Sequence, residues 1–167
     1  DTTGLTLTAS NTITEGGQIT YTATLTNPAQ TPVTVTLSNG AVINIAAGQT
    51  TGTVNVETPA NDVYNNGSTV STTITGATGG NFENLVPSTA PAVTTITDSV
   101  DTTTVTLTAT PTVNENGTIT YTATLTDANG NPVTAQNGPV TVTLDSGKTI
   151  TIAAGASSGA LDVAVGN

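Results

Sequence analysis

Ile19-Thr20-Tyr21-Thr22-Ala23-Thr24-Leu25-Thr26 is the stretch from which the fold can be deduced, and it returns unchanged as residues 119–126. Apolar residues alternate with threonine along it, and a period of two puts the apolar side chains on one face of a β-strand. Threonine is β-branched, favours strands and tolerates water, so it suits the outer face. The stretch predicts a half-buried strand that is used twice, in a repeat of about one hundred residues.

The same alternation predicts further strands on both sides of this one. No window shows the three-to-four spacing of a helix, and turn formers separate the alternating segments. Seven short strands with a turn about every ten residues predict an all-β fold, as tandem immunoglobulin-like antiparallel β-sandwiches arranged end to end. In the first copy the other six strands are expected at Leu5–Ala9, Pro32–Leu37, Val42–Ala46, Thr53–Glu57, Ser68–Thr75 and Pro91–Thr97.

The seam between the copies is the stretch 97–103, Thr-Asp-Ser-Val-Asp-Thr-Thr. We expect one repeat over residues 1–98 and a second over 99–167, with the linker at 97–103. The second copy carries a seven-residue insertion around Ala135–Pro139 and lacks the equivalents of roughly the last third of the first copy. Tandem repeats are seldom only two units long, so we expect the array to continue. In the first copy, Gly76–Ala90 is expected to be a loop that buries its three large apolar side chains, Phe82, Leu85 and Val86.

The charge of the chain restricts its partners. The formal net charge is -10, and Lys148 is the sole basic residue. One lysine cannot neutralise the phosphates of a nucleic acid or hold the chain on an anionic membrane, and no apolar run is long enough to cross a bilayer. We therefore expect no nucleic-acid partner, no membrane insertion and a monomer that contacts neighbouring repeats of the same chain.

Histidine and cysteine are both absent. The chain therefore lacks the residues that Ser-His-Asp catalysis, Cys-His catalysis and the usual zinc sites require. Asp98 with Asp101 is the one carboxylate pair that could be compared with a glycosidase pair, but a linker offers no enclosing cleft for a sugar. We expect the protein not to be an enzyme, and we expect a metal ion to supply the stability that disulfides would give.

The acidic residues are expected to gather at the seam. If each strand reverses direction, the loops at one end of the first copy face the second copy, which presents its own acids across the linker. Calcium takes six to eight oxygen ligands, and carboxylates brought close together without a cation repel one another. The sequence therefore predicts a Ca²⁺ site whose ligands are Glu15, Asp62, Asp98, Asp101, Asp127 and Asn129.

Simpler interpretations of these acids stay open. Asp127 and Asn129 belong to Asp127-Ala128-Asn129-Gly130-Asn131, which is rich in turn formers and could be a plain turn. Asp98 and Asp101 could be solvated linker residues. Flexible linkers, however, are usually rich in Gly, Ser or Pro, whereas this one is short and β-prone.

The motifs together resemble a known family. Asp101–Ala109, Val113–Thr126, Pro139–Leu144 and Ile150–Gly155 resemble the tandem immunoglobulin-like extender repeats of giant repeats-in-toxin (RTX) adhesins of Gram-negative bacteria. The resemblance implies a type I secreted, extracellular filament on the bacterial cell surface. It would fold in external calcium, bind the ion at its linkers and project a distal ligand-binding region for attachment and biofilm formation. The alternative function is direct binding of a carbohydrate or surface, for which Tyr64 and Phe82 are the candidate aromatic residues.

Overall fold

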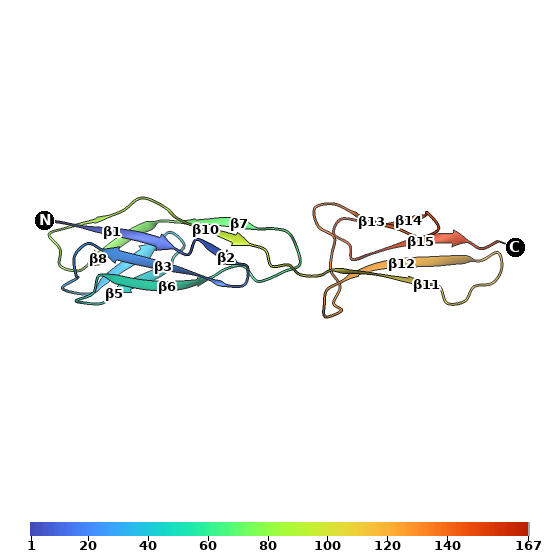
Figure 1. The fold of residues 1–167 in the computed structure, drawn as a ribbon, viewed down its shortest axis with the longest axis horizontal. Helices are drawn as coiled ribbons and strands as arrows, with labels where there is room; N and C mark the ends of the chain where they lie inside the picture. Colours follow the sequence, from blue (N-terminus) through green and yellow to red (C-terminus); the bar gives the residue numbers. More distant parts are fainter. Residues whose placement is uncertain (167) are drawn as a thin grey trace. The chain divides into compact units, whose positions relative to one another are not determined.

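The structure is a computed structural model that describes residues 1–166. These residues form β-strands and no helix, so the predicted all-β class is confirmed. Accordingly, the described part of the chain has no helix long and apolar enough to span a membrane. Two compact units divide the chain, unit 1 at Asp1–Ser99 and unit 2 at Val100–Asn167 (Figure 1).

Unit 1 is built from ten strands, three more than the alternation predicts. In chain order these are β1 (Thr2–Ala9), β2 (Thr12–Thr14), β3 (Gln18–Leu25), β4 (Val33–Leu37), β5 (Val42–Ile45), β6 (Thr51–Glu57), β7 (Ser68–Thr72), β8 (Ile74–Gly79), β9 (Asn84–Pro87) and β10 (Ala92–Thr97).

The strands of unit 1 lie in three sheets, ordered β6-β3-β1-β9, β2-β10-β7 and β5-β4-β8. Most neighbours are antiparallel, and Leu5 of β1 lies opposite Leu25 of β3, which places both on the same face. Two pairs are parallel, β1 with β9 and β10 with β2. Alternation could not reveal these parallel pairs, because a period of two carries no information about strand direction.

The segment after Gly67 differs from its prediction. The strand expected at Ser68–Thr75 is split at Thr73 into β7 and β8, because β7 pairs with β10 whereas β8 pairs with β4 in another sheet. The loop expected at Gly76–Ala90 contains the end of β8 and the whole of β9. Phe82 and Leu85 pack against the core as predicted, but the prediction for Val86 is wrong, because 46% of this residue is exposed.

The core of unit 1 lies between the apolar faces of these sheets. Along β3 and β4 the buried residues alternate with more exposed ones, as the threonine pattern predicts. Tyr21 is fully buried, and its hydroxyl forms a hydrogen bond of 2.8 Å with Thr72 Oγ1 in β7. The buried apolar residues that pack together as this core are Leu5, Leu7, Ile19, Tyr21, Ala23, Leu25, Ala29, Val33, Val35, Leu37, Ile43, Ile45 and Ala92.

Unit 2 repeats the first part of this arrangement. β12 pairs with β11 and β15 as β3 pairs with β1 and β6, and β13 pairs with β14 as β4 pairs with β5. The register is also the same, since Val105 lies opposite Leu125. The strands are β11 (Thr104–Ala109), β12 (Thr118–Thr126), β13 (Val140–Thr143), β14 (Thr149–Ile152) and β15 (Ser158–Ala164).

Candidate functional site

Three of the predicted ligands lie at one end of unit 1, on segments that are far apart in the sequence. The turn after β2 carries Glu15, the loop after β6 carries Asp62, and Asp98 directly follows β10. β2 runs parallel to β10, and the Glu15 N–H donates a 2.9 Å hydrogen bond to the Thr97 carbonyl. We call Glu15, Asp62 and Asp98, together with the polar residues that contact them, the acidic end of unit 1.

Glu15 is a buried carboxylate with weak hydrogen bonds. Only 8% of the residue is exposed. Its Oε1 accepts from the Asp62 N–H at 3.4 Å and from the Ser99 hydroxyl at 3.5 Å, and both distances are at the long limit for a hydrogen bond. A buried charge usually needs stronger compensation than this.

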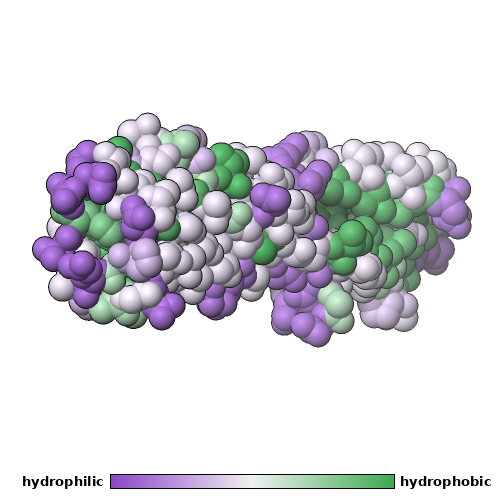
Figure 2. Space-filling view, turned by 60° about the vertical axis from the view of Figure 1, so that its left-hand side comes forward, coloured by the Kyte–Doolittle hydropathy of each residue, from purple (hydrophilic) through white to green (hydrophobic). Residues whose placement is uncertain are grey.

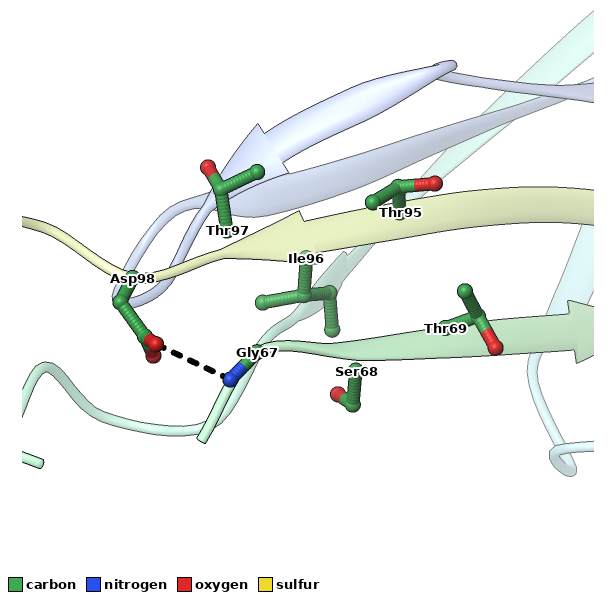
Figure 3. Close-up of a pocket in the computed structure, with 7 residues that line it drawn as sticks. All are labelled: Gly67, Ser68, Thr69, Thr95, Ile96, Thr97 and Asp98. Atoms are coloured by element: carbon green, nitrogen blue, oxygen red, sulfur yellow. Dashed lines mark hydrogen bonds between the residues drawn. The ribbon is translucent and has the colours of Figure 1, made fainter. Parts of the chain in front are cut away.

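Asp98 is held firmly by one of its two oxygens. Oδ2 accepts from the backbone N–H of Asn66 at 2.8 Å and of Gly67 at 3.0 Å, and Figure 3 shows the second of these bonds. Oδ1 is buried and has no hydrogen-bond partner. An unpaired buried oxygen on a carboxylate costs free energy, so Asp98 has the capacity to bind one further positive group.

Asp62 connects the other two acids. Its Oδ1 accepts from the Tyr64 N–H at 3.0 Å, and its Oδ2 accepts from the Asn66 side-chain amide at 3.0 Å. Asn66 in turn donates its backbone N–H to Asp98. One hydrogen-bonded chain therefore runs from Glu15 through Asp62 to Asp98.

No basic side chain is available at the acidic end. Residues 1–99 contain no Lys or Arg, and the N-terminal ammonium pairs with Glu83, which precedes β9. Within residues 1–166, no three acidic side chains are arranged as a ready metal-binding cluster. The donor set of carboxylates and amide oxygens nevertheless fits a hard cation, and the unpaired Asp98 Oδ1 is an available ligand atom.

The other three predicted ligands belong to unit 2. Asp101 is exposed and precedes β11. Asp127 and Asn129 lie in the turn after β12, where Asp127 Oδ1 accepts from the N–H groups of Asn129 and Asn131, both at 2.9 Å. This geometry matches the turn interpretation of Asp127-Ala128-Asn129-Gly130-Asn131, in which the carboxylate caps its own loop.

The hydrogen bonds of the turn around Asp127 predict how its carboxyl group titrates. The N–H of Asn131 is the largest influence on Asp127 and lowers the pKa of its carboxyl group, opposed by desolvation and assisted by the N–H of Asn129. Because the folded pKa lies below the unfolded one, the stabilisation is complete above the unfolded pKa and is lost as the pH falls through the folded pKa. A carbon-13 NMR titration should give Asp127 a midpoint below that of aspartate in an unfolded peptide, and an equal or higher midpoint would contradict the turn.

Sequence reasoning missed the polar residues that connect the acids. Asn61 accepts a hydrogen bond from the Ser99 hydroxyl, and Asn66 contacts both Asp62 and Asp98. The Asn-rich loop after β6 was a signal for such contacts, but it is also the composition of an ordinary turn. The three-residue strand β2, which sets the place of Glu15, is too short for alternation to identify.

Comparison with known families gives one match that covers both units. The family model described as the LapA domain matches residues 1–99 and, a second time, residues 101–167. A comparison with curated proteins finds no match.

Proposed function

The chain belongs to the LapA domain family, and from this premise we propose that its units are extender modules of a bacterial cell-surface adhesin. LapA is a large adhesin of the biofilm type, so an adhesin-related function and a location at the cell surface follow from the family. The proposal adds that these units are immunoglobulin-like repeats of the repeats-in-toxin type, exported by type I secretion. As spacers they would hold a distal ligand-binding region away from the cell.

The composition and surface of unit 1 support a spacer over a binding domain. Direct carbohydrate binding generally uses exposed aromatic side chains. Phe82 packs against the core and Tyr64 is only partly exposed. The repeated units instead present strands with threonine on their outer faces. Such a surface suits a module that acts as a spacer.

Calcium is the cofactor that we propose for the acidic end of unit 1. The observation that carries this proposal is the buried Asp98 Oδ1, which has no hydrogen-bond partner. Asp98 directly follows Thr97, whose carbonyl accepts the backbone N–H of the buried Glu15. Glu15, Asp62 and Asp98 would hold the ion, and its charge would offset theirs. Asp101, Asp127 and Asn129 of unit 2 remain proposed additional ligands.

The expected consequence is a chain that is stiffer outside the cell than inside it. The three acids belong to the turn after β2, the loop after β6 and the exit from β10, so an ion held by all three would fix the start of the linker. Extracellular calcium modules have dissociation constants on the order of 0.1–1 mM, which leaves them empty at cytoplasmic calcium. At millimolar calcium, which is at most about a tenfold excess over such a dissociation constant, an ion that binds only the folded state adds up to about 1.4 kcal/mol.

We expect millimolar calcium to raise the melting temperature of the chain by several degrees. Small-angle X-ray scattering should then fit an ensemble with fewer conformations than it does without calcium. Asp98→Asn should abolish both effects because it weakens the available ligand. Asp145→Asn is the matched control, since it removes the same charge from the exposed turn between β13 and β14 and should leave the calcium response intact. Identical melting curves with calcium and with a chelator would refute the calcium proposal.

A further inference from the structure

The apolar side of β11 is exposed, whereas the equivalent side of β1 is buried. Leu7 is 8% exposed and its equivalent Leu107 is 52% exposed, while Leu5 is fully buried and its equivalent Val105 is 45% exposed. Figure 2 shows apolar surface gathered on unit 2, the part toward the right. The two strands have nearly the same sequence, so the difference lies in what covers them.

This exposed surface forms a groove of about 460 Å³. We call it the open face of unit 2. Its counterpart in unit 1 is buried, since the residues equivalent to its apolar members are at most 8% exposed: Leu5, Leu7, Tyr21, Val35 and Leu37. The open face is lined by Val105, Leu107, Tyr121, Val142, Thr143, Leu144, Asp145 and Ser146.

In unit 1 the segment Ser68–Thr97, which forms β7 to β10, covers these residues. Thr72 of β7 bonds to the Tyr21 hydroxyl, and Ile74 of β8 lies opposite Leu37. Ala92 of β10 is part of the buried core. The cover therefore supplies apolar side chains and, for Tyr21, the Thr72 hydroxyl.

We propose that the open face of unit 2 is a docking site for a repeat-derived β-segment with the pattern of Ser68–Thr97. β11 and β12 have the register of β1 and β3, so they present the same surface to such a segment. The threonine at the position of Thr72 would bond to the Tyr121 hydroxyl, to which no hydrogen bond is present within residues 1–166. The aliphatic residue at the position of Ile74 would cover Leu144, the equivalent of Leu37.

A second copy of the chain fits this face less well. Pairing two open faces would cover the apolar side chains, but both surfaces would present a Tyr121 hydroxyl without the threonine that satisfies Tyr21 in unit 1. A buried hydroxyl without its partner costs free energy. The repeat-derived segment meets both the apolar and the polar requirement of the groove.

The direct test measures, by fluorescence anisotropy, the binding of a labelled peptide of residues 68–97 to the 167-residue chain. We expect saturable binding at one peptide per chain. Leu107→Asp should weaken binding at least about tenfold, because it places a charge in the apolar groove. Thr106→Asp is the matched control, since it adds the same charge to β11 on its opposite face and should leave the affinity unchanged.

A second experiment tests the same docking if the separate peptide binds too weakly to be detected. Attaching a copy of residues 61–99 after Asn167 makes the encounter intramolecular and raises the effective concentration to the millimolar range. Amide hydrogen exchange in β11 and β12 should then slow by at least about tenfold. This readout does not depend on calcium, so it is separate from the test of the extender function.

Two results would overturn the proposal. One is unchanged exchange in β11 of the extended chain. The other is dimerisation of the unmodified chain that is lost in Leu107→Asp, measured by sedimentation, because this would assign the open face to a second copy.

Discussion

Replacing Gly52 with valine is expected to unfold unit 1 under conditions in which the unmodified chain is folded. A Cβ at this position would lie 2.3 Å from the Asn44 carbonyl oxygen and 3.0 Å from Ile43 Cγ2. Both neighbours belong to β5, and backbone cannot move aside as the end of a flexible side chain can. Overpacking of this kind against backbone costs about 3 kcal/mol or more, which lowers the melting temperature of a domain this size by more than about 10 °C.

Gly76→Ala is the control for this prediction. Gly76 lies in β8, and a Cβ there would meet nothing within 4 Å. The alanine should be neutral or slightly stabilising, because it restricts the unfolded chain. Thermal unfolding followed by circular dichroism measures both variants, and equal melting temperatures for Gly52→Val and Gly76→Ala would contradict the close approach of β6 to β5.

The same close approach recurs in unit 2. A Cβ on Gly159 would lie 2.2 Å from the Thr151 carbonyl oxygen, and these two residues are the equivalents of Gly52 and Asn44. The glycine is therefore a property of the repeat, and it allows the strand after the hairpin to cross closely over that hairpin.

Leu7→Ala is expected to destabilise unit 1 far more than Leu107→Ala destabilises unit 2. Leu7 is 8% exposed and Leu107 is 52% exposed. Truncating the buried leucine removes apolar contacts and leaves a cavity, which costs about 3 kcal/mol, whereas truncating a half-exposed leucine costs less than about 1 kcal/mol. The pair compares the same substitution at the same position of two repeats.

Amide hydrogen exchange on the intact chain tests both variants, because it gives the local opening free energy of each unit separately. Leu7→Ala should accelerate exchange throughout β1 and β3, and Leu107→Ala should change exchange in β11 only slightly. An equal loss of protection in the two units would mean that Leu107 is covered as well as Leu7, and the open face of unit 2 would then not exist as described.

The candidate site was only partly predictable from the sequence. Reversal of strand direction was enough to expect that Glu15, Asp62 and Asp98 share one end of unit 1, and the structure connects them by hydrogen bonds. The part played by Asn66 and Ser99 was not predictable, because their contacts depend on the path of the loop after β6. The turn around Asp127 follows from local composition alone, and local interactions do account for it.

The sequence by itself determined the all-β class, the faces of the long strands and the repeat, because alternation of apolar residues with threonine is a local property of each strand. Only the tertiary structure decided that β10 pairs in parallel with β2, that Asp98 Oδ1 is buried without a partner, and that β11 is exposed while β1 is buried. These features depend on which distant segments pack together. Two strands of nearly the same sequence can therefore have different surroundings, and the segment Ser68–Thr97 makes that difference between β1 and β11.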